Sequence, residues 1–145
     1  MKKTILTLLA VVAVFCCTAP AAQASSSSHS VQFNSSVRLT GNVWRQTILD
    51  WDNCANYATS VVSNRVLDSV TNKTVAEPYG LGASAWGLSV SGPGGSTSTT
   101  WTNSNSRGSY LSGNVCASWN TLYLAMTVNG TGNYNGVVRT VAAQV

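Results

Sequence analysis

Few side chains in this 145-residue sequence are of the types that perform acid–base or nucleophilic catalysis. They are one histidine and four carboxylates: His29, Asp50, Asp52, Asp68 and Glu77. A Ser–His–Asp site needs an imidazole that a rigid scaffold holds within hydrogen-bond reach of the nucleophile. His29 instead lies in the serine-rich stretch 25–30, which has no apolar side chain to bury. The sequence therefore predicts no catalytic triad.

Asp50 and Asp52 are the most suggestive pair, because glycoside hydrolysis uses two carboxylates that flank the scissile bond. On a strand, positions i and i+2 point the same way, so the second carboxylate would have to be Asp68 or Glu77. The same oxygens with Asn53 suit calcium, but the spacing lacks the glycine and the distal glutamate of an EF-hand loop. We interpret these carboxylates as solvated or capping groups and expect no catalytic residue, no metal site and no cofactor.

Aromatic side chains are the strongest compositional oddity, since five tryptophans and five tyrosines outnumber two phenylalanines. Most of these rings are expected to fill the core and one face of a sheet. Tyr134 stands between Asn133 and Asn135 in a glycine-rich turn, where we expect it to be exposed. Trp101 and Trp119 are flanked by polar residues and are also expected to be exposed. Exposed rings beside amides and hydroxyls can stack on sugars or anchor a protein interface, so these five residues form the predicted ligand-binding set.

The N-terminus has the pattern of a cleavable export signal over residues 1–24. Two lysines precede an apolar run at 5–17, and alanines at positions 22 and 24 suit a signal peptidase. A membrane anchor would need about 20 apolar residues, more than this run supplies, and the residues before Cys17 are too bulky for a lipoprotein signal. The sequence predicts that the protein is secreted and extracellular.

Cys54 and Cys116 are the two cysteines that would remain after the signal is removed. Because secretion exposes them to an oxidising compartment, we expect them to form a disulfide. Two thiols so far apart, with one histidine and no CxxC pair, make no recognisable metal site. The bridge would close a loop of 62 positions. For a loop of that length, chain entropy predicts about 4 kcal/mol of stabilisation.

Short alternating segments define the expected fold. A flexible leader at 25–30 is predicted to precede a single domain at 31–145, whose first strand shows apolar alternation from Val31 to Val43. Residues 51–70 fit helical or extended spacing, and their serine, threonine and valine content favours a strand. With glycine, asparagine and serine between the segments, the sequence predicts an all-β fold, a small antiparallel β-sandwich or barrel with one disulfide.

A first hairpin is predicted at 85–102, with the four residues 92–95 as its loop. In that register Trp86 would face Trp101, and two indoles would meet across the strands. A second hairpin is predicted from apolar alternation at 122–128 and 137–143. Its turn is either Asn129-Gly130 alone or the whole glycine-rich run to Gly136, and the register stays open between the two.

Charge and composition limit the functions that the sequence predicts. The predicted mature chain has six basic residues against four acidic ones, without the basic clusters that nucleic acids require, so no nucleic-acid partner is expected. The leading hypothesis is a secreted non-enzymatic binding module whose ligand is a glycan or an extracellular protein. The alternative is a secreted antagonist: a bacteriocin-like or membrane-active toxin that inserts the strands at 86–101, or a protease inhibitor. Only that alternative brings contact with a membrane.

Overall fold

The computed structural model of the chain describes residues 24–47, 53–88, 90–91 and 95–145. These residues form strands and turns and contain no α-helix. None of them therefore belongs to a helix long and apolar enough to span a membrane. The strands are β1 (Ala24–Gln32), β2 (Arg38–Gln46), β3 (Cys54–Tyr79), β4 (Ala85–Trp86), β5 (Val90–Ser91), β6 (Thr97–Ala117), β7 (Tyr123–Tyr134) and β8 (Val137–Gln144).

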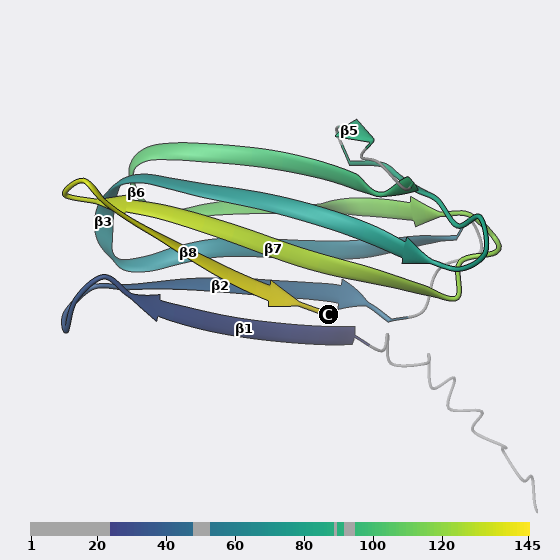
Figure 1. Cartoon of the computed structure of the whole chain (residues 1–145), viewed down its shortest axis with the longest axis horizontal. Coiled ribbons are helices and arrows are strands. Elements are labelled where there is room, and N and C mark those ends of the chain that lie inside the picture. The colour runs from purple at the N-terminus through teal and green to yellow at the C-terminus, as the bar shows by residue number, and fades with distance from the viewer. Residues whose placement is uncertain (1–23, 48–52, 89, 92–94) are drawn as a thin grey trace, which may run out of the picture.

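All eight strands belong to one antiparallel sheet that curls into a half-barrel (Figure 1). Its backbone is the long pair β3 and β6, which bends where the register shifts between Val62 and Leu67. Before the bend β3 pairs with β2, and after it β3 pairs with β7. Strand β8 then comes to lie against β1 and β2. The prediction of an all-β antiparallel fold is confirmed, and so is the preference for a strand in the described part of 51–70.

Alternation along each strand places one set of side chains in the interior of the curl. Leu39 and Val43 on β2, Val61 on β3 and Met126 and Val128 on β7 are fully or almost fully buried. Burying one such aliphatic side chain contributes about 1.5–3 kcal/mol relative to leaving it exposed. The core therefore lies between the two halves of the curled sheet and holds them together.

A buried hydrogen-bond network crosses this core. The hydroxyls of Thr59 and Thr74, from the two halves of β3, lie 2.6 Å apart. The Asn72 amide nitrogen donates to the Thr59 hydroxyl at 3.1 Å and also to the Ser109 carbonyl oxygen at 3.4 Å. Because buried polar groups are costly unless paired, these bonds fix how the two halves of the sheet face each other.

The predicted disulfide is confirmed. Cys54 opens β3 and pairs in register with Cys116 near the end of β6, and their sulfurs are bonded. The bridge therefore closes one of the two ends of the long β3–β6 pair, the end formed by the start of β3 and the end of β6.

The serine-rich stretch 25–30, expected to be a flexible leader, lies within β1. It pairs with β2 along its whole length. Side-chain bonds across the two strands support this pairing, such as Ser28 Oγ to Asn42 Oδ1 at 2.7 Å and the Ser30 and Thr40 hydroxyls at 2.8 Å. Apolar burial is therefore not what orders this edge strand, which explains why a search for apolar alternation missed it. The predicted signal peptide lies almost wholly outside the described residues.

The predicted pairing of Trp86 with Trp101 is wrong. Trp86 on β4 pairs with Cys116, and Trp101 on β6 pairs with Asn72 of β3. The local hairpin is short and displaced by one residue, with Val90 opposite Ser98. The reason is that β6 takes the long β3 as its main partner, which leaves only two residues of β5 to pair locally.

The C-terminal hairpin exists, but its turn is at neither predicted position. Tyr134 pairs with Val137, so the turn is Asn135-Gly136, and both residues have positive φ, 52° and 77°. That combination is typical of the type I′ turn that two-residue hairpins favour. Asn129-Gly130 is instead part of β7.

Candidate functional site

The five predicted ligand-binding residues do not form one site. Trp101 lies on β6 opposite Asn72, and Trp119 lies in the connection from β6 to β7. Both side chains are exposed, as the sequence suggested, and 87% of Trp119 is accessible to solvent. Asn133 and Asn135 lie at the end of β7 and in the turn after it.

Tyr134 is not exposed in the way the sequence predicted. It is the last residue of β7, and the alternation that buries Val128, Gly130 and Gly132 carries its ring to the inner face. There it packs against the core and meets Phe33 edge-to-face, with ring centroids 6.0 Å apart. The prediction failed because it placed Tyr134 in a turn that begins one residue later.

The candidate catalytic groups are also scattered. His29 is exposed on β1 and Asp68 is exposed on β3, while Asp50 and Asp52 lie outside the described residues. Glu77 accepts a hydrogen bond from the Tyr79 hydroxyl at 3.2 Å, and this contact raises the pKa of Tyr79. Among the residues that the structure describes, no three acidic, histidine or cysteine side chains gather where they could hold a metal ion.

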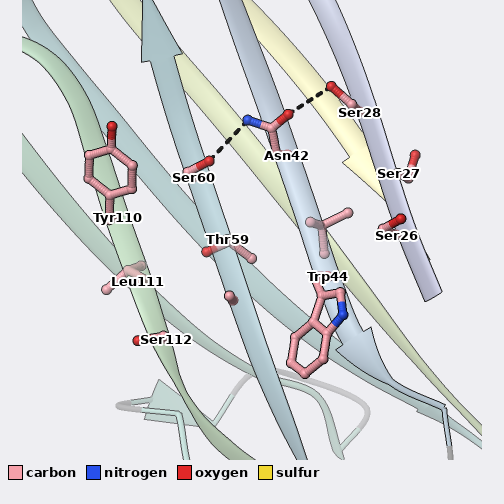
Figure 2. Close-up of a pocket in the computed structure, with 12 residues that line it drawn as sticks. Ser26, Ser27, Ser28, Asn42, Trp44, Thr59, Ser60, Tyr110, Leu111 and Ser112 are labelled. Atoms are coloured by element: carbon pink, nitrogen blue, oxygen red, sulfur yellow. Dashed lines mark hydrogen bonds between the residues drawn. The ribbon is translucent and has the colours of Figure 1, made fainter. Parts of the chain in front are cut away.

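A groove of about 650 Å³ crosses the outer face of the sheet over β1, β2, β3 and β6. The strand register builds it from two rows of side chains. Each row takes one side chain from each of the four strands. One row is Ser28, Asn42, Ser60 and Tyr110, and the next is Ser26, Trp44, Ala58 and Ser112. Small side chains thus lie between two large aromatic ones, and Figure 2 shows Trp44 and Tyr110 on different strands of the groove.

A chain of hydrogen bonds fixes the polar row. Asn42 Nδ2 donates to Ser60 Oγ at 3.0 Å, and Ser28 Oγ donates to Asn42 Oδ1 at 2.7 Å (Figure 2). These bonds set the orientation of the Asn42 amide. They leave the second amide hydrogen of Asn42 and the hydroxyl hydrogen of Ser60 for a ligand, as well as lone pairs on Ser28.

The two aromatic side chains keep a large part of their surface in water. Trp44 is 37% exposed and Tyr110 is 67% exposed. Tyr110 lies over Gly108, because a Cβ built on that glycine would be 2.9 Å from the tyrosine ring. Trp44 and Tyr110 are two strands and one row apart, which places their Cα atoms about 12 Å from each other. An extended ligand is needed to contact both.

The groove is electrically neutral. Its lining consists of hydroxyls, one amide, two aromatic rings and aliphatic groups, and contains no charged side chain. Such a surface suits a ligand that is itself neutral, with hydroxyls to bond and apolar faces to stack. Sequence reasoning counted Trp44 and Tyr110 among the aromatic residues but did not select them, because their partners in the groove come from strands distant in the chain.

Trp119 belongs to a different surface, an exposed apolar tip that it forms with Leu81 and Leu122. These side chains are 87–95% exposed. Backbone and amide contacts tie their two loops together: Asn120 Nδ2 donates to the Leu81 carbonyl, and Leu122 N donates to the Tyr79 carbonyl at 2.8 Å. The tip therefore presents apolar surface from two connected loops at the disulfide end of the molecule.

Comparisons with protein-family models, with curated proteins and with solved structures find no match to this chain.

Proposed function

We propose that this protein is a secreted, non-enzymatic binding module that holds a neutral glycan in the groove between Trp44 and Tyr110. The observation that carries the proposal is the pair of adjacent rows that set hydroxyl and amide groups beside two exposed aromatic rings on one sheet face. An indole face stacks on the apolar face of a sugar, and fixed donors and acceptors bond its hydroxyls.

Each feature of the groove has a part in this binding. Trp44 provides the main stacking surface, with only Ser26 and Ala58 beside it in its row. Asn42 and Ser60 supply oriented donors beside it. Tyr110 contacts a second sugar further along, so an oligosaccharide is bound more tightly than a monosaccharide.

The expectation of secretion fits the same proposal. The two lysines and the apolar run near the N-terminus have the pattern of an export signal. The disulfide between Cys54 and Cys116 is of a kind that persists in oxidising compartments. A protein that a cell exports meets polysaccharides at the surface of that cell and at the surfaces of neighbouring cells.

Affinity electrophoresis in gels that contain soluble neutral polysaccharides (glucan, mannan and xylan) tests the proposal. We expect at least one polysaccharide to retard the wild-type protein and Trp44→Ala to lose most of that retardation. An aromatic side chain that the bound ligand buries contributes about 2 kcal/mol to the binding free energy, which corresponds to about a thirtyfold change in Kd. Trp101→Ala removes an exposed indole outside the groove and is the matched control. Retardation that Trp101→Ala abolishes and Trp44→Ala preserves would contradict the proposal.

The apolar tip supports a second candidate function, contact with a membrane. Leucine and tryptophan side chains that no part of the described chain covers suit the interface between lipid headgroups and acyl chains. This assignment places membrane contact at Leu81, Trp119 and Leu122 rather than along residues 86–101. Flotation with anionic liposomes tests it: wild-type protein should float with the vesicles, and Trp119→Ala should remain at the bottom of the gradient.

A further inference from the structure

Arg45 of β2 is the one charged side chain that is buried among the described residues, with 3% of its surface exposed. Its Nη1 donates to the carbonyl oxygens of Gln46 and Thr47 at 2.7 and 3.4 Å. The guanidinium lies over the ring of Tyr123, 5.5 Å from its centroid. Its Nε is buried without a hydrogen-bond partner. The positive charge is thus held in place but not neutralised by these contacts.

Within the described part of the chain, no carboxylate is paired with Arg45. The two acidic residues described there are Asp68, which is exposed, and Glu77, which bonds Tyr79. A buried ionised group without a counter-charge is costly, since the interior solvates it much less well than water does. The described part of the chain thus supplies no carboxylate for this guanidinium, and its charge is available to an acidic ligand.

A cavity of about 280 Å³ adjoins the guanidinium. Its lining includes four hydroxyl residues, Ser25, Thr47, Thr121 and Tyr123, and Leu122 and Leu124 add apolar surface. Hydroxyls donate to an anion without adding charge. One positive charge with neutral donors around it matches a single negative charge.

We propose that this cavity, the Arg45 pocket, binds a carboxylate. A guanidinium presents parallel N–H groups that fit the two oxygens of a carboxylate, and such charge-assisted bonds are among the stronger ones in proteins. The small volume and the leucines suit a short organic acid or the acidic group of a sugar acid. Arg45 and Trp44 are neighbours on one strand and point to opposite faces of it, so this site does not depend on the groove.

Thermal unfolding in a chloride-free buffer of constant ionic strength tests the proposal with sodium acetate and sodium glucuronate. A ligand that binds the folded protein raises Tm progressively as its concentration exceeds Kd. We expect both carboxylates to raise the Tm of the wild-type protein and of Trp44→Ala, and we expect glucose to leave the Tm of Trp44→Ala, whose groove lacks its main stacking ring, unchanged. Arg45→Gln should abolish the response to the carboxylates. Arg38→Gln, on the same strand but exposed, is the control with an equal change in charge.

Several results would overturn the proposal. One is an equal response of the wild-type protein and Arg45→Gln, which would be a general salt effect. Another is a rise in Tm with sulfate or phosphate but not with acetate, which would exclude a carboxylate as the ligand class. A third is a wild-type protein that no anion stabilises and an Arg45→Gln variant with a much lower Tm, which would mean that the chain itself, through Asp50 or Asp52, supplies the counter-charge.

A second variant keeps the test decisive if Arg45→Gln does not fold. Thr121→Val removes one hydroxyl of the pocket and leaves the guanidinium in place. We expect it to weaken acetate binding severalfold, measured by the chemical shifts of backbone amides during a titration. An unchanged affinity, or shifts that do not include residues 45–47 and 121–124, would contradict the assignment.

Discussion

Tyr110 owes its position in the groove to a residue without a side chain. Its ring occupies the space above Gly108, which has no positive φ and so accepts alanine without backbone strain. We predict that Gly108→Ala turns the ring aside, because the new methyl group would lie 2.9 Å from it. Glycan affinity should fall severalfold while the urea midpoint stays nearly unchanged. Gly113→Ala is the control, since its Cβ would be 3.5 Å from the nearest atom, which is ordinary contact. Equal losses of affinity in both variants would argue against this role of Gly108.

Tyr57 is a buried core residue through which the stability of the folded protein depends on pH in the alkaline range. It is 6% exposed on the inner face of β3, and burial raises the pKa of its hydroxyl above the ordinary value. A group whose pKa is raised in the folded state favours the protonated form there, so its contribution is complete below the unfolded pKa, about 10. The contribution is lost as pH rises from there through the folded pKa.

We therefore predict that the free energy of unfolding of the wild-type protein falls with rising pH above about 10, more steeply than that of Tyr57→Phe. Urea unfolding at a series of alkaline pH values measures both curves. The control is Tyr110→Phe, whose hydroxyl lies on an exposed ring. Parallel curves for the wild-type protein and Tyr57→Phe would show that Tyr57 does not titrate differently in the folded state.

At the scale of residues, the sequence predicted the exposure of two indoles correctly, but it did not predict which side chains meet across the strands. It expected exposed indoles at Trp101 and Trp119, and these side chains are exposed. It placed Tyr134 in a turn, although strand alternation carries the ring inward to Phe33. The groove around Trp44 was not foreseen, because its neighbours Ser26, Ala58 and Ser112 come from three other strand segments. Their meeting depends on register, which no local pattern contains.

At the scale of elements, the glycines of β7 shape the curl. Gly130 and Gly132 face the interior, and a Cβ on Gly130 would lie 2.7 Å from both methyl groups of Val61. Because Val61 is itself fully buried, it has little room to move. Glycine at this position therefore lets β7 approach the first half of β3 closely.

We predict that Gly130→Ala overpacks this contact and lowers the free energy of unfolding by about 1–3 kcal/mol. The measurement is urea unfolding followed by tryptophan fluorescence. Thr131→Ala, next to Gly130 but on the other face of β7, is the control and should change stability by less than about 0.5 kcal/mol. A Gly130→Ala variant as stable as the wild-type protein would mean that β7 packs less tightly against Val61 than the structure indicates.

The pairing of whole strands explains why the predicted registers of the two hairpins were wrong. The sequence alternation at 85–102 is consistent with a local hairpin, but the 21-residue β6 pairs with the 26-residue β3. That pairing joins residues far apart in the chain, and it determines which residue faces Trp101. The C-terminal turn had a local signal in Asn135-Gly136, which competes with the identical dipeptide Asn129-Gly130. Interior packing against Val61 and Val141 distinguishes the two.

At the scale of the whole molecule, the disulfide and the all-β fold were the features that the sequence predicted correctly. Both follow from global properties: the two cysteines that lie beyond the predicted export signal, and short alternating segments without helical periodicity. The curl of the sheet depends instead on the bend of β3 and β6 between Val62 and Leu67. Nothing in the local sequence predicted that bend.

We predict that the double variant Cys54→Ala, Cys116→Ala loses about 4 kcal/mol of stability, since the bridge closes a loop of 62 positions in the unfolded chain. Urea unfolding of the variant and of the wild-type protein, with and without reductant, measures the loss. Reductant should lower the stability of the wild-type protein and leave the variant unchanged. A variant with wild-type stability would show that the β3–β6 ladder needs no covalent closure.

We propose above all that one face of this molecule, the groove over β1, β2, β3 and β6, is its binding surface. The most direct test is a titration of the isotope-labelled protein with neutral oligosaccharides from the polysaccharide that retards it, followed by amide and indole NMR signals. We predict shifts at residues 26–28, 42–44, 58–60 and 110–112, with the Trp44 indole among the largest. Shifts confined to residues 133–135 or to Leu81, Trp119 and Leu122 would contradict the account.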